Sequence, residues 1–435
     1  MKSACLIGAG SSGIAVAKAL HERGVPFDAF EASDRVGGNW VFGNKNGMSS
    51  AYKGLHINTS RARMEYSDFP MPPGTPHFPH HSTIAAYFEA YIDRFGLRDK
   101  IAFETRVARV EKRGPYAYEV ALSTGETRRY DAVIVANGHH WDPLWPEPAF
   151  PGTLAGQVLH SHDYKEPAPF AGKRVVVLGM GNSAMDIAVE LSHVADRVFL
   201  AARRGAHVVP KLLFGVPLDQ VFTSTRVPRR LRLLLGGAAL RAAVGDVTRY
   251  GLPKPDHALG EAHPTISSRI LDRLAHGAVT PKPNLERLDG GEVVFVDGSR
   301  ERVDAVIYAT GYKVTFPFFD ESFVSAKDNE LPLYKRVFHP EHEGLAFAGL
   351  LQPLGAIMPL AEAQGLWLAE VLAGACALPD RRAMDAAIAR ERAQLRARYV
   401  RSKRHTMQVD FDEYLEDVHT EIARGRRRAG AAARG

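Results

Sequence analysis

The stretch ACLIGAGSSG, residues 4–13, decides the fold, because a short apolar run leads directly into Gly8, Gly10 and Gly13. A G-x-G-x-x-G turn between a strand and a helix is typical of dinucleotide-binding domains. The first glycine permits the tight turn, the second lets the backbone approach a pyrophosphate, and the third lets the helix pack on the strand. The helix N-terminus then favours the negative charge of the phosphates. The start of the chain therefore predicts a nucleotide-binding α/β domain.

A second copy of this pattern lies in the middle of the chain. The apolar run 175–178 leads into Gly179, Gly181 and Ala184, which form a G-x-G-x-x-A turn. A single match to this motif is weak evidence. Two matches, each between a strand-like and a helix-like segment, predict two dinucleotide sites in one chain.

The two copies differ at the end of the strand that follows each turn. In the first copy, Glu31 follows the strand 25–30, and a carboxylate at this position accepts hydrogen bonds from the hydroxyls of an unphosphorylated ribose. In the second copy, the same spacing gives Ala202, followed by Arg203 and Arg204. Arginine pairs with a phosphate through a planar fork of donors. The first site is thus predicted to bind FAD or NAD, and the second NADPH.

Length and composition predict more than one domain. The chain has 435 residues, of which 45% are hydrophobic and 24% charged, as in ordinary globular proteins. We expect an α/β fold with two Rossmann-like dinucleotide-binding domains, the NADPH domain being inserted in the FAD domain. The FAD domain is expected over residues 1–165 and 304–420, and the NADPH domain over residues 166–303. Residues 421–435 are rich in Gly, Ala and Arg and are predicted to be a basic, disordered tail.

The cysteine content and the charge exclude several classes of protein. With only Cys5 and Cys376, the chain has neither a disulfide framework nor the redox cysteine pair of a pyridine-nucleotide–disulfide reductase. We expect a cytoplasmic protein, because the chain has few cysteines and no recognisable targeting leader. We expect no transmembrane segment, because no apolar run reaches about 20 residues. The net charge of +6 is modest for this length, and we expect no nucleic-acid partner. A homodimer is the base-rate expectation.

Motifs along most of the chain resemble those of flavin-containing monooxygenases. Residues 156–165, GQVLHSHDYK, are similar to the identifying motif F-x-G-x-x-x-H-x-x-x-Y/F-K/P, although Leu154 stands in place of the leading aromatic residue. This motif lies just before the second glycine turn, where the family has it. The other similar segments are residues 37–40 (GGNW), 58–60 (NTS), 68–70 (DFP), 308–312 (YATGY), 349–353 (GLLQP) and 404–406 (RHT).

This resemblance implies a chemistry. NADPH would reduce FAD, and O2 would add to the reduced ring to give a C4a-hydroperoxide. The cofactor supplies the difficult chemistry, while the protein orients the reactants and excludes water. A soft nucleophile of a small molecule, such as an amine nitrogen or a thioether sulfur, would then take the distal oxygen. No nucleophile of the protein is required for this reaction.

The resemblance also implies site residues. Asn58 would be the catalytic residue, because a neutral amide donates a hydrogen bond to a peroxide without titrating it. No metal site is expected, since His160 and His162 have no cluster of acidic residues or cysteines beside them. The expected FAD-binding residues are Gly8, Gly10, Ser12, Gly13, Glu31, Gly38, Trp40, His56, Asn58, Thr310, Gln352 and Gln364. The expected NADP-binding residues are His160, Tyr164, Gly179, Gly181, Asn182, Ser183, Arg203 and Arg204.

The sequence leaves three other functions open. A Baeyer–Villiger monooxygenase would oxygenate a ketone instead, although its motif usually ends in tryptophan where this chain has Tyr164 and Lys165. A non-catalytic flavin- or NADPH-binding sensor would keep both glycine turns. An uncoupled NADPH oxidase would release H2O2. The substrate itself is not specified by any motif.

Overall fold

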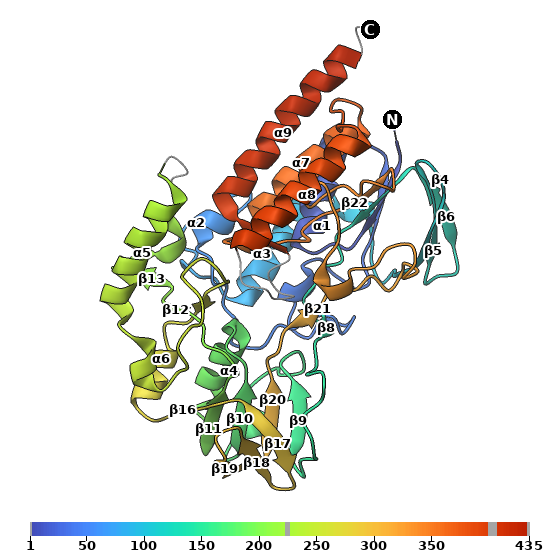
Figure 1. The fold of residues 1–435 in the computed structure, drawn as a ribbon. Helices are drawn as coiled ribbons and strands as arrows, with labels where there is room; N and C mark the ends of the chain where they lie inside the picture. The colour runs from blue at the N-terminus through green and yellow to red at the C-terminus, as the bar shows by residue number, and fades with distance from the viewer. Residues whose placement is uncertain (1, 222–226, 399–406, 433–435) are drawn as a thin grey trace. The chain divides into compact units, whose positions relative to one another are not determined.

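The computed structural model describes residues 2–221, 227–398 and 407–432. The chain forms two compact units, each of which contains one of the glycine turns (Figure 1). Unit 1 comprises Met1–Ser49, Thr59–His139 and Val314–Gly435, and unit 2 comprises Ser50–Asn58 and His140–Lys313.

Unit 1 is built on a five-stranded parallel sheet with the first glycine turn at the end of its central strand. Its strand order is β22-β7-β1-β2-β3, and every neighbouring pair is parallel. The strands are β1 (Ala4–Ile7), β2 (Phe27–Phe30), β3 (Ile101–Ala102), β7 (Ala132–Val135) and β22 (Leu345–Phe347). β1 and β7 are buried throughout, which explains why they are apolar runs without a polar alternation.

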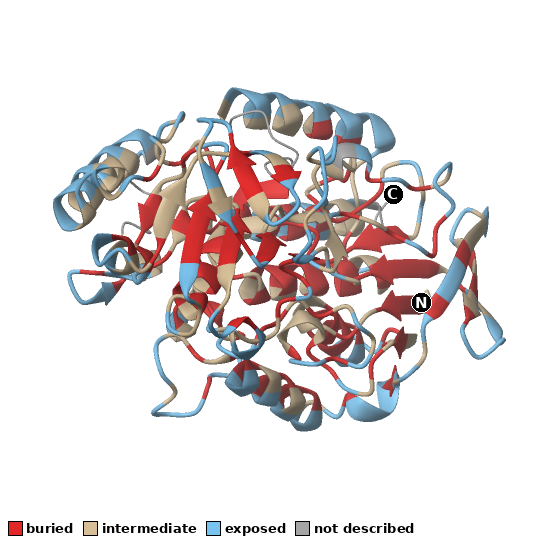
Figure 2. Ribbon diagram, turned by 90° about the horizontal axis from the view of Figure 1, so that it is seen from below, coloured by how far each residue is buried: buried red, intermediate tan, exposed pale blue. Residues whose placement is uncertain are grey.

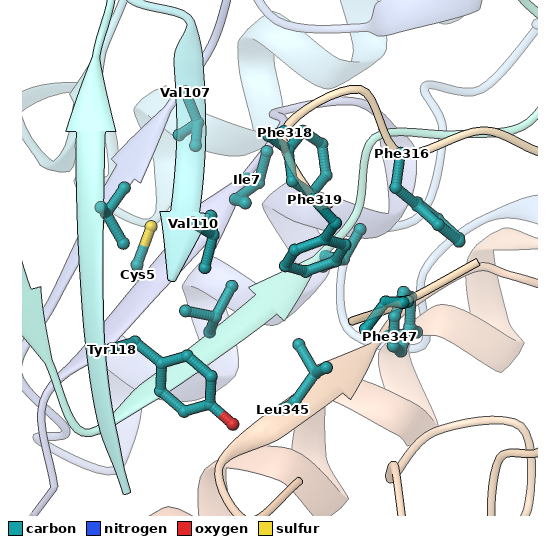
Figure 3. Close-up of a cluster of buried hydrophobic side chains, with 14 of the residues drawn as sticks. Cys5, Ile7, Val107, Val110, Tyr118, Phe316, Phe318, Phe319, Leu345 and Phe347 are labelled. Carbon is teal, nitrogen blue, oxygen red and sulfur yellow. The ribbon is translucent and has the colours of Figure 1, made fainter. Parts of the chain in front are cut away.

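Helices and a second sheet complete this unit. Helix α1 (Ser11–Glu22) packs on α7 (Met358–Leu372) and contacts α3 (His81–Arg94). An antiparallel sheet is formed by β4 (Val107–Gly114), β5 (Ala117–Leu122) and β6 (Thr127–Tyr130). Side chains from both sheets and from the segment 314–333 share one hydrophobic core, in which Phe316, Phe318 and Phe319 lie near Phe347 (Figure 3). The remaining elements are α2 (Arg61–Met64), α8 (Arg381–Arg398), β23 (Gln352–Leu354), β24 (Gln408–Asp410) and α9 (Phe411–Ala432).

Unit 2 repeats this architecture. Its parallel sheet has the order β16-β11-β10-β20-β9, again with the glycine turn after the central strand. The strands are β9 (Gln157–His160), β10 (Arg174–Leu178), β11 (Arg197–Ala201), β16 (Thr280–Lys282) and β20 (Ala305–Tyr308), and helix α4 (Asn182–Leu191) follows β10. An antiparallel sheet of β17 (Leu285–Asp289), β18 (Glu292–Phe295) and β19 (Arg300–Arg302) precedes β20. Two Rossmann-like domains, one inserted in the other, are therefore confirmed.

The other elements of unit 2 are short apart from one helix. They are β8 (Asp142–Pro143), β12 (Val208–Val209), β13 (Leu212–Leu213), β14 (Val216–Pro217), α5 (Arg229–Val244), β15 (Thr265–Ile266), α6 (Ile270–Ala275) and β21 (Tyr312–Lys313). Across both units the 3-10 turns are η1 (Gly38–Trp40), η2 (Arg98–Lys100), η3 (Ala168–Phe170), η4 (Leu218–Gln220), η5 (Val247–Tyr250) and η6 (Lys327–Asn329). Figure 2 shows buried strands in the sheets and exposed outer faces on the surface helices.

The unit boundaries differ from the expected domains. Residues 140–165 and 304–313 belong to unit 2, because β9 and β20 are strands of its parallel sheet. Residues 50–58 also belong to unit 2, although the chain on both sides of them lies in unit 1.

The prediction of a disordered tail is wrong for residues 421–432, which continue helix α9. The helix is held by apolar burial, since Val418 and Ile422 are 0% and 3% exposed. Arg426 also donates to the buried Glu370 of α7 at 2.7 Å. A Gly- and Arg-rich composition thus indicated disorder where tertiary packing stabilises a helix.

Candidate functional site

Two glycines of the first turn are explained by the fold itself. Gly8 has φ +98°, and a Cβ there would lie 2.7 Å from the Ala136 carbonyl oxygen. A Cβ on Gly13 would collide with the Gly8 carbonyl. Both positions therefore require glycine for the turn and for close packing of α1 on the sheet.

Gly10 is different. Its φ of −72° and ψ of −174° suit any residue, and the nearest atom to a Cβ there is Gly38 Cα at 3.8 Å. Neither backbone strain nor packing accounts for glycine at this position. It is also the N-cap of α1, and no side chain caps the helix there. Open space beside uncapped helix N–H groups fits the close approach of a pyrophosphate.

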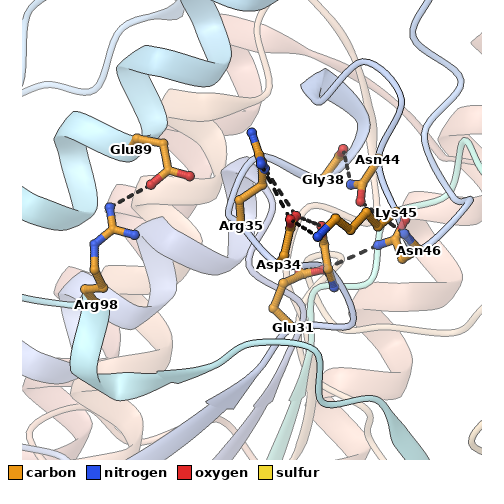
Figure 4. Close-up of polar contacts among 10 residues, drawn as sticks. Glu31, Asp34, Arg35, Gly38, Asn44, Lys45, Asn46, Glu89 and Arg98 are labelled. Carbon is orange, nitrogen blue, oxygen red and sulfur yellow. Dashed lines mark hydrogen bonds and ion pairs between the residues drawn. The ribbon is translucent and has the colours of Figure 1, made fainter.

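Glu31 lies beside this turn at the end of β2. Its carboxylate accepts the Ala9 N–H at 2.7 Å and the Ser33 N–H at 2.8 Å. The Asn46 amide lies 3.4 Å from the same carboxylate (Figure 4). Burial raises the pKa of Glu31, and these hydrogen bonds oppose the rise. The carboxylate therefore ties the glycine turn to the end of β2, the position at which a ribose is expected.

The other expected FAD residues of unit 1 serve several purposes. Ser12 Oγ lies so close to Gly349 that a Cβ on residue 349 would collide with it. Trp40 is half-buried at the end of η1, and Gln352 begins β23. Gln364 is completely buried; it accepts the Gly349 N–H at 2.8 Å and donates to Tyr414 at 2.7 Å. The Gln364 amide thus joins the Gly349 turn to Tyr414 of α9.

Three expected FAD residues lie in unit 2, namely His56, Thr310 and Asn58. His56 is exposed, with Nδ1 2.9 Å from the Gly54 carbonyl oxygen. The Thr310 hydroxyl donates to the Leu144 carbonyl at 2.5 Å. The segment 404–406 lies outside the residues that the structure describes.

The second glycine turn has the same form as the first. Gly179 has φ +150°, and a Cβ there would lie 2.5 Å from the Ala309 carbonyl oxygen. Gly181 is the N-cap of α4, with φ −84° and ψ 176° and no side-chain cap. Asn182 Oδ1 accepts the Ile266 N–H at 2.8 Å, which anchors β15 to the turn, and Ser183 is half-buried. The start of α4 is therefore a second uncapped helix N-terminus suited to an anion.

The two arginines beyond β11 are not equivalent. Both are exposed, and Arg204 Nε lies 3.6 Å from Asp256. Arg203 forms no ion pair with any residue that the structure describes. Arg203 is therefore the cation that has its full donor capacity for a ligand.

The histidine and tyrosine of the 156–165 motif are buried inside unit 2. His160 is 0% exposed; burial and the neighbouring His162 lower its pKa to about 4, so the ring is neutral at physiological pH. Its Nδ1 accepts the His162 N–H at 3.1 Å. Tyr164 is also 0% exposed and donates to Glu190 of α4 at 2.7 Å. In this structure Tyr164 is bonded to α4, whereas the His160 ring packs against Trp145 and Tyr312.

Asn58 has the feature expected of a residue that meets a ligand. Its Oδ1 is buried and has no hydrogen-bond partner among the described residues. A buried polar atom without a partner is costly and calls for an explanation. Rotation of the amide exchanges its oxygen and nitrogen, so this position can present a donor or an acceptor.

The comparisons with known proteins identify the family. Residues 1–426 match the family model described as flavin-binding monooxygenase-like. The chain belongs to this family. It is 40% identical to flavin-containing monooxygenase 5 of Oryctolagus cuniculus, over 96% of this chain and 82% of the relative. It is 36% identical to dimethylaniline monooxygenase [N-oxide-forming] 2 of Rattus norvegicus, over 97% of this chain and 82% of that protein.

Solved structures agree with this assignment. The S-allyl-L-cysteine S-oxygenase of Allium sativum superposes with a TM-score of 0.73 at 26% identity, over 97% of this chain and 88% of the other. A cyclohexanone monooxygenase gives a TM-score of 0.72 over 98% of both chains, but at 18% identity this likeness shows the fold alone.

Membership of the flavin-binding monooxygenase family makes the chain a flavoprotein monooxygenase. Its cofactors are FAD and NADPH, as the two glycine turns predict. In the described part of the chain, no helix is both long and apolar enough to cross a membrane.

Sequence reasoning missed a group of polar residues around α4. Tyr52 donates to Asp186 at 2.6 Å, and Lys211 Nζ donates to the Ile57 carbonyl at 3.1 Å. One signal was available, because Asp186 and Glu190 are four residues apart and so share a face of the helix after the second turn. Nothing in the sequence pairs them with Tyr52 or Tyr164.

Proposed function

We propose that this monooxygenase uses NADPH and O2 to transfer one oxygen atom to an amine nitrogen or a thioether sulfur of a small molecule. The observation that carries the proposal is the pair of matching nucleotide turns, one followed by Glu31 and the other by Arg203. The N-oxide-forming relative and the S-oxygenase support nitrogen and sulfur as acceptors.

In this proposal the two units bind different cofactors. Unit 1 holds FAD, with its pyrophosphate at Gly10 and its ribose at Glu31. Unit 2 holds NADPH, with its pyrophosphate at Gly181 and Ser183 and its 2′-phosphate at Arg203. FAD, once reduced by NADPH, supplies the activation of O2. Asn58 donates a hydrogen bond to the oxygen that is transferred, as an uncharged donor in a water-poor site.

A substrate comparison tests the acceptor. The purified holoenzyme is incubated with NADPH and N,N-dimethylaniline, a dialkyl sulfide or cyclohexanone, and the products are identified by mass spectrometry. We expect the N-oxide or the sulfoxide, with kcat/KM at least about tenfold above that for lactone formation, since even modest differences in transition-state binding separate substrates by this factor. A dominant lactone would establish a Baeyer–Villiger enzyme. Stoichiometric H2O2 without product would establish an oxidase, and a flavin that NADPH does not reduce would establish a sensor.

The choice of NADPH over NADH depends on Arg203 in this account. Arg203→Ala should raise the KM for NADPH roughly ten- to hundredfold, because the loss of a charge-assisted hydrogen bond to phosphate weakens binding by about this factor. The KM for NADH should stay within about twofold. Arg204→Ala is the matched control, and a smaller effect is expected because Asp256 lies beside that guanidinium. Anaerobic flavin reduction at varied NADPH and NADH measures both. Equal effects on the KM for NADPH and for NADH would show that Arg203 does not bind the 2′-phosphate.

We also propose a cytoplasmic homodimer. The small number of cysteines and the base rate for soluble enzymes support it. Light scattering of the eluted protein should give about twice the 47.7 kDa chain mass, and cell fractionation should recover the protein without detergent. A mass near that of one chain would contradict the homodimer, and recovery only with membranes would contradict the cytoplasmic location.

A further inference from the structure

Residues 50–58, which end at Asn58, are fastened to unit 2 by several contacts. The Lys53 N–H donates to the Lys165 carbonyl at 2.7 Å. The Tyr52 side chain, which is 5% exposed, donates to Asp186 at 2.6 Å. Gly54 lies against Glu190, whose carboxylate would collide with a Cβ at that position. Unit 2 therefore determines where this segment runs.

Asp186 and Glu190 connect the segment to the second glycine turn. Both are on α4, whose N-cap is Gly181, and they face Tyr52 and Tyr164 respectively. Burial raises the pKa of both carboxyl groups, and the tyrosine hydroxyl bonded to each opposes the rise. The tyrosines thus satisfy two carboxylates that are costly to bury.

One contact reaches the residue next to Asn58. Lys211 Nζ donates to the carbonyl oxygen of Ile57 at 3.1 Å. That carbonyl belongs to the peptide group that joins Ile57 to Asn58, and a peptide group is planar. The bond therefore restrains the orientation of the backbone from which the Asn58 side chain projects.

Lys211 is itself held in place. The backbone N–H of Lys211 donates to Ser268 Oγ at 3.0 Å, and its backbone carbonyl accepts the Leu218 N–H at 2.9 Å. Burial lowers the pKa of the ammonium group, while the negative charge of Asp186 raises it. Lys211 is half-buried, and placing its ammonium group partly out of water has a cost that an apolar residue at this position would avoid.

We propose that Lys211 is a positioning residue that sets the orientation of Asn58 through the Ile57 carbonyl. This inference rests on the proposed catalytic role of Asn58. Lys211 then controls how much of the consumed NADPH ends in oxygenated product and how much ends in H2O2, without taking part in reduction of the flavin.

The test uses Lys211→Met in the full-length holoenzyme. At saturating amine or sulfide substrate, we expect the H2O2 released per NADPH to rise at least about fivefold and the kcat for product to fall roughly tenfold, because small displacements of a catalytic group are costly. Substrate KM and anaerobic flavin reduction should stay within about twofold. Lys211→Arg should restore most of the coupling, because a guanidinium also donates to a carbonyl. Lys53→Met is the matched control, because Lys53 is an exposed lysine of the segment 50–58 whose side chain pairs with Glu166. Normal coupling is expected of this variant.

Normal coupling in Lys211→Met would overturn the proposal, and so would an equal loss of flavin reduction. If the Lys211→Met protein does not retain flavin, the shorter, uncharged Lys211→Gln variant is tested in its place. Normal coupling, or an equal loss of flavin reduction, in that variant would likewise overturn the proposal. The double variant Lys211→Met/Asn58→Leu should be no worse than Asn58→Leu alone, since both changes act on one group. If Asn58→Leu oxygenates normally, the proposed function of Asn58 fails, whatever Lys211 does.

Discussion

Asn58→Leu is expected to lower the rate of product formation by at least about a hundredfold, the effect of removing one donor from a developing charge. Leucine has a similar volume and no amide, so the change removes the hydrogen bond without opening a large cavity. The buried Oδ1 of Asn58 has no partner among the described residues, so no other hydrogen bond of that atom is lost. NADPH should still reduce the flavin, and the enzyme should release H2O2 in place of product.

Three measurements separate this result from a folding defect. Flavin content, thermal midpoint and anaerobic flavin reduction of Asn58→Leu should all match the wild type. Asn284→Leu is the matched control, because Asn284 is a half-buried asparagine of the same unit, and its oxygenation rate should be unchanged. Normal product formation by Asn58→Leu would refute the catalytic role.

Gly10→Val is expected to give a folded protein with less than about a tenth of the wild-type flavin. The conformation of Gly10 suits valine, and the first atom that a Cβ meets is Gly38 Cα at 3.8 Å. The added methyl groups would instead occupy the space where a pyrophosphate approaches the backbone. Absorbance of the purified protein measures flavin per chain, and circular dichroism measures folding.

Gly114→Val provides a matched control for this change. Gly114 is also half-buried in unit 1, and the atom nearest to a Cβ there is Ala117 Cβ at 3.9 Å. It lies in β4, in the antiparallel sheet, so its variant should retain FAD. A Gly10→Val protein with full flavin content would show that this turn does not bind the dinucleotide.

The parts of the fold that follow from local chemistry could be predicted from the sequence. The apolar runs before the glycine turns are β1 and β10, and Glu31 stands at the end of β2, because turn geometry and burial are specified by adjacent residues. The same reasoning failed for residues 421–432. Their composition resembles a disordered tail, but the helix depends on packing of Val418 and Ile422 and on Glu370 from α7.

In the candidate site, too, local features could be predicted from the sequence and tertiary contacts could not. The glycines and Arg203 have a recognisable spacing, whereas the membership of residues 50–58 in unit 2 depends on pairs such as Tyr52 with Asp186. Such pairs join residues far apart in the chain, and neither partner has a local signature. The burial of Tyr164 and Gln364 likewise shows that a residue expected to bind a cofactor can serve the structure around a site.

Incorporation of 18O from 18O2 tests the central claim most directly. The holoenzyme is supplied with NADPH, 18O2 and the tertiary amine or sulfide that it turns over best, and the product is examined by mass spectrometry. We expect one 18O atom in each product molecule and one NADPH consumed per product formed. Product without the label, or consumption of NADPH that yields H2O2 alone with every amine and sulfide tried, would contradict it.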